Sequence, residues 1–165
     1  MSDPGSQTDA RQAMERILAS QSVGHLGLTD AGEVYVVPLN YTYSRGRILF
    51  HCALEGRKLD MIRANPRVCF EVSCQGAEPL PHGGDPCDTP FESVICWGTA
   101  RIVEDLSERR AILDEFQMRF EKPGGPREPV PMARVERCGA VEIAVSRMTG
   151  RRGLGHRPER WEWVA

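Results

Sequence analysis

The chain has 165 residues, 41% of them hydrophobic, a length and composition typical of one domain with its own core. Its formal net charge of −2 argues against a general binder of nucleic acid or of anionic membranes. No apolar run approaches the roughly 18 residues of a membrane span, and residues 1–7 lack the apolar core of a signal peptide. We therefore expect a cytoplasmic protein that contacts neither nucleic acid nor membrane.

The first half of the chain predicts one helix and then short strands joined by turns. Thr8 is expected to cap the helix, whose apolar positions recur at helical spacing up to Leu18. Alternating apolar residues predict strands at four places: residues 22–29, 33–41, 48–51 and 67–73. A short helix from Arg57 to Asn65 stands before the last of these, and Pro66 ends it.

The second half contains longer loops between its elements. Residues 75–90 form a Gly- and Pro-rich loop, of a length that is often functional in compact domains. The further expected elements are a strand over residues 93–104, a helix from Ser107 to Phe120 or Glu121, a loop over 122–131 and a strand within 135–147. We expect loop from Thr149 onward, with a domain core over residues 20–147 and tails at 1–7 and 149–165. Short strands with few helices favour a mainly β fold, an antiparallel barrel with minor α.

The run Gly56-Arg57-Lys58 has the composition of a phosphate site. It follows an apolar strand that ends at His51, and its two cations fall in the first turn of the expected helix. Free N–H groups and the helix dipole favour anions there, and Gly56 allows a ligand close to the backbone. The alternative to a phosphate site is that the two cations are simply solvated at a helix start.

Six segments of the chain resemble one known family in order and spacing. They are residues 37–41, 50–53, 56–59, 62–66, 68–72 and 92–100. They resemble the flavin-binding split barrels of the pyridoxamine-phosphate-oxidase-like superfamily, and among these the nitroimidazole-reductase-like (Nim-type) proteins most closely. The resemblance implies a single domain folded as an antiparallel split β-barrel with flanking short helices. It also implies FMN as cofactor and a homodimer with two flavin sites at the subunit interface.

The resemblance also implies which residues bind the cofactor. Lys58, with Arg57 as its partner, matches the phosphate-binding positions of the family. Four residues of one strand are expected along the isoalloxazine ring: Val37, Pro38, Leu39 and Asn40. Cys52 and Ser93 match further positions beside the cofactor, although Ser93 is also a common residue at a strand start. Pro38 removes one ladder donor, which predicts an edge or bulged strand, and Asn40 has the alternative of a polar residue beside a turn.

His51 is the candidate catalytic residue. A lone histidine is more often a structural hydrogen-bonding group, but in the resembled proteins a histidine here lies against the flavin and meets substrate. The other three histidines, at positions 25, 82 and 156, show no ligand spacing with it, so we expect no metal site.

The six cysteines form no CxxC pair. Cys52, Cys69 and Cys96 lie in strand patterns, where a cysteine is usually a small buried hydrophobe. A reducing compartment agrees with that interpretation. Cys87 lies in the long loop, where an inert exposed thiol is favoured over a pocket-lining one.

Together these features predict an FMN-dependent oxidoreductase. It would reduce small aromatic or nitro compounds with electrons from a reduced nicotinamide, and the apolar residues Val36, Leu39, Ile95 and Trp97 are candidates for the surface that a second copy covers. Three alternatives stay open: a non-catalytic flavin-binding electron carrier, a haem-handling barrel using His51 or His156, and a pyridoxamine-phosphate oxidase. The last is disfavoured because residues 157–161 only loosely match that enzyme's C-terminal segment.

Overall fold

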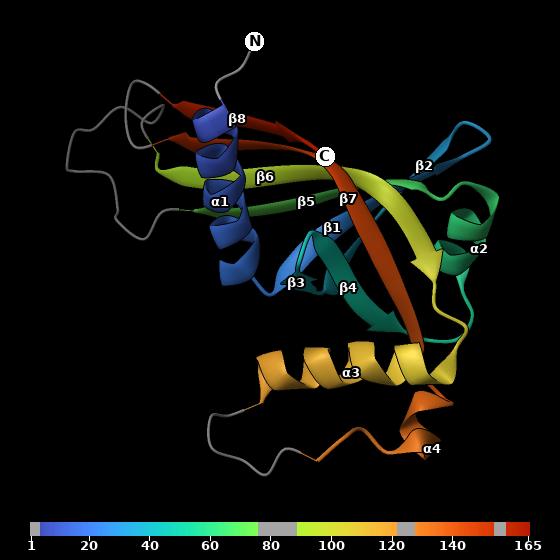
Figure 1. The fold of residues 1–165 in the computed structure, drawn as a ribbon. Coiled ribbons are helices and arrows are strands. Elements are labelled where there is room, and N and C mark those ends of the chain that lie inside the picture. Colours follow the sequence, from blue (N-terminus) through green and yellow to red (C-terminus); the bar gives the residue numbers. More distant parts are fainter. Residues whose placement is uncertain (1–3, 76–88, 122–127, 154–157) are drawn as a thin grey trace.

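The computed structural model describes residues 4–75, 89–121, 128–153 and 158–165 (Figure 1). Within this part of the chain the helices are α1 (Pro4–Ser20), α2 (Arg57–Ala64), α3 (Leu106–Phe120) and α4 (Met132–Val135). The strands are β1 (Val23–Asp30), β2 (Glu33–Asn40), β3 (Thr42–Ser44), β4 (Arg47–Cys52), β5 (Arg67–Gln75), β6 (Phe91–Ile102), β7 (Gly139–Gly153) and β8 (Glu159–Val164).

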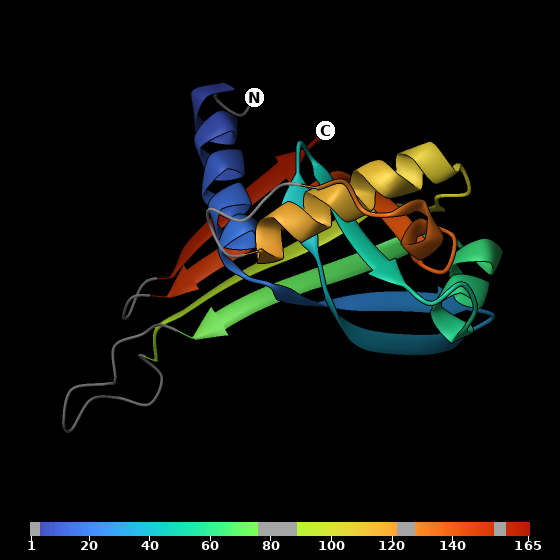
Figure 2. The same cartoon turned by 90° about the horizontal axis from the view of Figure 1, so that it is seen from below.

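The strands form one antiparallel sheet in the order β2-β1-β5-β6-β7-β4-β3, with β8 added to β7. Its two ends, β2 and β3, are separated in sequence only by Tyr41, so the sheet must curl to bring these ends together. Figures 1 and 2 show the result, a half-barrel in which β6 and β7 bend across the whole molecule. The antiparallel split β-barrel predicted from the sequence is confirmed.

The core lies on the concave side of this sheet, where alternate residues of each strand point inward. Tyr41, Phe50 and Phe70 are fully buried there. The Tyr41 hydroxyl donates a 2.5 Å hydrogen bond to the Leu18 carbonyl, which ties the corner between β2 and β3 to the end of α1. This contact satisfies a buried polar group and fixes where the sheet turns.

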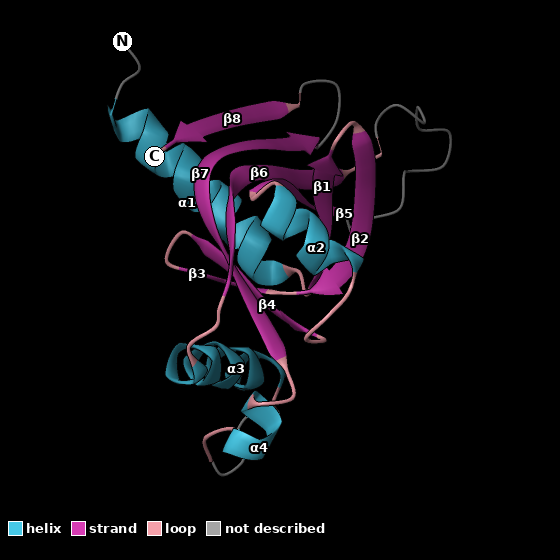
Figure 3. Ribbon diagram, turned by 90° about the vertical axis from the view of Figure 1, so that its right-hand side faces the viewer, coloured by secondary structure: helices cyan, strands magenta, loops and turns pink. Residues whose placement is uncertain are grey.

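Three helices occupy different ends of the half-barrel. α1 packs against β8 and β6, α2 against β1 and β6, and α3 against β4 and β7. Figure 3 shows α2 in the mouth of the barrel and α3 with α4 beyond the end of β4. The two helices that follow β4 and β6 in sequence therefore lie against different parts of the sheet.

A bulge between Trp97 and Gly98 lets the long strands β6 and β7 bend. A Cβ atom on Gly98 would lie 2.3 Å from the Ala144 carbonyl oxygen, so no larger residue fits at this crossing. The bulge follows Trp97 directly, and the Trp97 ring lies on the convex face of the sheet beneath the guanidinium of Arg147.

Several predicted boundaries were wrong. α1 begins at Pro4, so Thr8 lies within the helix, and the N-cap of α3 is Asp105 rather than Ser107. The expectation of loop from Thr149 was also wrong, because β7 continues to Gly153 and β8 follows it. Trp161 and Trp163 pack against the core, which is why this terminal segment forms a strand. Cys87, His82 and His156 lie outside the described residues.

Candidate functional site

The first turn of α2 is open to an anionic ligand. Gly56 adopts φ +133°, a backbone conformation that other residues rarely take, and the space where its Cβ would lie is empty. As the N-cap it supplies no side-chain hydrogen bond to the helix. The amide groups of this turn therefore have no side-chain cap, as a phosphate-binding helix start requires.

The two cations of this turn have different surroundings. Arg57 forms an ion pair with Glu33, and its guanidinium lies 4.7 Å from the centroid of the Tyr35 ring. Lys58 is half-buried and has no hydrogen-bond or ion-pair partner within the described part of the chain. Lys58 is thus the cation available to a phosphate, while Arg57 is held against the β1–β2 hairpin.

Lys58 faces the end of β4. Burial raises the pKa of the Cys52 thiol, and the positive charge of Lys58 acts in the opposite direction with a smaller effect. Cys52 packs against the core as the sequence suggested. The structure therefore places Lys58 close enough to Cys52 for its charge to act on the thiol, with Arg57 one residue away on the same turn.

β2 is an edge strand, as Pro38 predicted, because the sheet order ends with it. Val37 and Leu39 are half-buried and pack against the core, whereas Pro38 and Asn40 are exposed on the other side. Glu33 and Tyr35, at the start of β2, contact Arg57. An elongated ligand with its phosphate at α2 would thus extend along β2 toward residues 37–40.

His51 points away from this site. Neighbouring strand residues face opposite sides, so His51 leaves β4 on the face opposite to Cys52. Its ring meets the Phe116 ring of α3 edge to face, with centroids 4.5 Å apart and an interplanar angle of 81°. Burial lowers the pKa of His51, and the charge of Arg134 lowers it further, so the imidazole is neutral at neutral pH.

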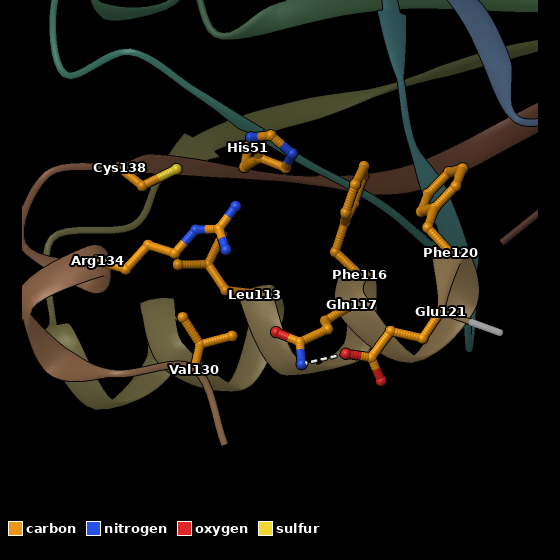
Figure 4. Close-up of a pocket in the computed structure, with 9 residues that line it drawn as sticks. All are labelled: His51, Leu113, Phe116, Gln117, Phe120, Glu121, Val130, Arg134 and Cys138. Atoms are coloured by element: carbon orange, nitrogen blue, oxygen red, sulfur yellow. Dashed lines mark hydrogen bonds between the residues drawn. The ribbon is translucent and has the colours of Figure 1, made fainter. Parts of the chain in front are cut away.

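A pocket of about 360 Å³ opens beside His51 (Figure 4). α3 supplies its apolar wall, and the polar groups of His51, Arg134 and Cys138 gather at one end. The nine residues that line it are His51, Leu113, Phe116, Gln117, Phe120, Glu121, Val130, Arg134 and Cys138. Its size lies at the lower end of the roughly 300–1,000 Å³ of small-molecule sites.

Ser93 lies near the start of β6 and pairs with Ser73, whereas Arg67, at the start of β5, pairs with Thr99. The six residues from Ser93 to Thr99 span about 20 Å along the strand. The contact of Ser93 with the cofactor stays a prediction.

Sequence reasoning missed the contribution of α3 and α4 to the pocket. The helix itself was predicted, but not its place beside His51, and its last residue, Phe120, is 44% exposed in the structure. Arg134 and Cys138 carry no sequence signal for this site, because only the folded chain brings them to His51.

A second, mainly apolar pocket of about 320 Å³ lies on the convex face of the sheet. Cys69, Trp97 and Val34 line it, and Val34 is 75% exposed. No group of three or more His, Cys, Asp or Glu side chains with metal-site geometry occurs among the described residues. None of the helices described here combines the length and apolarity needed to cross a bilayer.

Comparison with known proteins agrees with this geometry. A 64-residue stretch is 27% identical to an uncharacterized protein of Rhizobium meliloti and covers 39% of this chain but only 42% of that relative. The solved structure of a candidate 5-nitroimidazole antibiotic resistance protein from Bacteroides thetaiotaomicron has a TM-score of 0.72 and 28% identity, over 85% of this chain and 82% of that one.

A FAD-binding protein from Mycobacterium smegmatis superimposes with a TM-score of 0.56 and 26% identity, over 86% of this chain and 94% of that one. The sequence profile of the pyridoxamine 5'-phosphate oxidase family matches residues 10–152, which is most of the chain. The chain belongs to this family of split barrels, the flavin-binding superfamily that its sequence resembles.

Proposed function

We propose that the protein binds FMN, with the phosphate held by Lys58 and the first turn of α2 and the ring lying along β2. The observation that carries the proposal is Lys58, which has no partner among the described residues, beside an uncapped helix start and the open space at Gly56. Lys58 contributes a compact charge, and Arg57 can add a fork of donors if its ion pair with Glu33 opens.

The strand β2 would hold the isoalloxazine ring. No described strand pairs with its outer backbone edge, so the N–H and C=O groups of that edge can meet the polar edge of the ring. Asn40 is exposed beside that edge and can both donate and accept. When bound, the flavin supplies the electron and hydride chemistry.

The reaction we propose is reduction of a small aromatic or nitro compound with electrons from a reduced nicotinamide. The relative of 28% identity is described by resistance to a nitroaromatic class of drug, and the pocket beside His51 is walled by aromatic rings. His51, neutral at neutral pH, can donate a hydrogen bond or pass a proton to a substrate there.

Flavin fluorescence titration tests the phosphate assignment. Lys58→Ala should weaken FMN binding by about 1.5–3 kcal/mol, roughly 10- to 150-fold, since a charge-assisted contact is lost. Arg63→Ala is the matched control, because it removes a cation from the other end of the same helix, where Arg63 pairs with Asp60. An unchanged dissociation constant for Lys58→Ala, or an equal loss for Arg63→Ala, would refute the assignment.

A non-catalytic flavin carrier would pass the same binding test, so turnover must be measured separately. Loss of the nicotinamide absorbance, when the purified FMN-loaded protein is mixed with reduced nicotinamide and a nitroaromatic compound, supports the oxidoreductase. Tight FMN binding without any such oxidation would favour the carrier.

A further inference from the structure

We propose that the pocket beside His51 binds a small planar aromatic monocarboxylate, with its ring against Phe116 and its carboxylate on Arg134. The interpretation of this pocket as the substrate or inhibitor site of an oxidoreductase rests on the function proposed above. As a binding site it is built from residues that lie apart from the phosphate-binding turn of α2.

The aromatic wall fixes the shape of the ligand. The Phe116 and Phe120 rings lie 4.6 Å apart between centroids at an interplanar angle of 31°, and His51 meets Phe116 edge to face. Leu113 and Val130 complete the apolar lining. A flat ring can stack or tilt against such a wall, whereas a branched aliphatic ligand would leave part of it uncovered.

Arg134 supplies the cation at one end of the pocket. Its guanidinium points toward His51 and Cys138 (Figure 4), and it has no hydrogen bond or ion pair in the described chain. Arg109 donates hydrogen bonds to the carbonyls of Val103 and Val135, which fixes the turn that carries Arg134. A planar carboxylate matches the fork of guanidinium donors, with the neutral imidazole of His51 as a further donor.

The opposite end of the pocket limits the charge of the ligand. Glu121 lies there and accepts a hydrogen bond from the Gln117 amide (Figure 4). The guanidinium of Arg134 balances one negative charge on the ligand, and the Glu121 carboxylate at the opposite end disfavours a second one. A dianionic phosphate brings a second charge for which the described residues of the lining provide no cation, so the geometry favours a monocarboxylate.

Benzoate is the probe for this inference. Calorimetric titration of the full-length protein should show benzoate binding that weakens at least tenfold in Arg134→Gln. It should remain within twofold in Arg137→Gln, which removes a neighbouring charge that does not line the pocket. Benzamide, which keeps the shape but not the charge, should bind at least tenfold more weakly than benzoate, and phenyl phosphate should bind no more tightly.

The proposal is overturned if Arg134→Gln binds benzoate as the parent does, if Arg137→Gln loses as much affinity, or if benzoate does not bind at all. Arg134→Lys is the second variant, and it should keep part of the affinity for benzoate because the positive charge remains. Unchanged thermal unfolding of both variants excludes misfolding as the cause of a loss. FMN titration of the same samples separates the two proposals, since benzoate binding with no FMN binding contradicts only the function proposed above.

Discussion

His51 and Cys52 are neighbours in the sequence, yet the alternation of β4 turns them toward different sites. Cys52 faces the core beside Lys58, and His51 faces α3. The sequence predicted both residues beside one cofactor. In the folded chain their side chains leave opposite faces of β4. A flavin held by Lys58 would therefore contact His51 only by passing around the end of that strand.

Because of this placement, replacing His51 tests the chemical step rather than cofactor binding. His51→Ala should leave the FMN dissociation constant within about twofold and lower turnover by roughly 10²–10⁴-fold, the range of general acid–base catalysis. His25→Ala is the control, because His25 is paired with Glu71 at 3.0 Å on the convex face. Steady-state kinetics on FMN-loaded protein give both values. Unchanged turnover with reduced thermal stability would make His51 a packing residue for Phe116.

At the scale of elements, the position of α3 decides whether the pocket exists. Asp105 caps this helix by accepting hydrogen bonds from the Ser107 and Glu108 amides at 3.0 and 2.9 Å and from the Ser107 hydroxyl. These bonds lower the pKa of the Asp105 carboxyl, the Ser107 hydroxyl most strongly. The stabilisation is therefore present above the ordinary value of 3.8 and is lost as the pH falls through the lower folded value.

Asp105→Ala should lower the thermal unfolding midpoint at neutral pH, because two amides lose their acceptor. Glu104→Ala removes the adjacent exposed carboxylate without touching the cap and should change the midpoint little. The difference in unfolding midpoint between the parent and Asp105→Ala should shrink at a pH below 3.8, the ordinary pKa of this carboxyl group. Calorimetry of the three proteins at both pH values measures this, and equal midpoints for the two variants at neutral pH would contradict the assigned cap.

Local signals explain how much of the fold was predictable. The strands β1, β2 and β4 and residues 67–73 of β5 were predicted because their apolar alternation is visible within each segment. The extension of β7 was missed because Gly150 and Gly153 with nearby arginines look like loop, and only pairing with β6 and β8 makes them strand. Asp105 was overlooked in favour of Ser107, although Glu108 three residues later completes a capping pattern.

The candidate site was predictable only in part. Lys58 and Gly56 lie close in sequence, so a local pattern could identify them. Arg134 and His51 are more than 80 residues apart in the sequence but line the same pocket, so no local sequence pattern contains both. Residues of the site that depend on tertiary packing therefore had to come from the structure.

For the whole molecule, the convex face of the sheet stands out because it carries exposed apolar side chains. Val36 is 58% exposed there and lies in one cross-strand row with Cys69 and Trp97. Ile95 lies on the same face, whereas Leu39, named with them from the sequence, packs against the core instead. Contiguous exposed apolar residues of this kind mark an interaction surface.

We expect a second copy of the chain to cover this face. Val36→Glu should convert a homodimer into a monomer at micromolar concentration, because a charge would be buried without a partner. Met118→Glu is the matched control, since Met118 is similarly exposed at 56% but lies on the helix α3 rather than on this face of the sheet. Light scattering with size-exclusion chromatography measures the mass of each protein. If residues such as Ser93 complete the flavin site of the opposite protomer, Val36→Glu should also weaken FMN binding. A parent protein that is monomeric at this concentration and still binds FMN tightly would contradict the shared site.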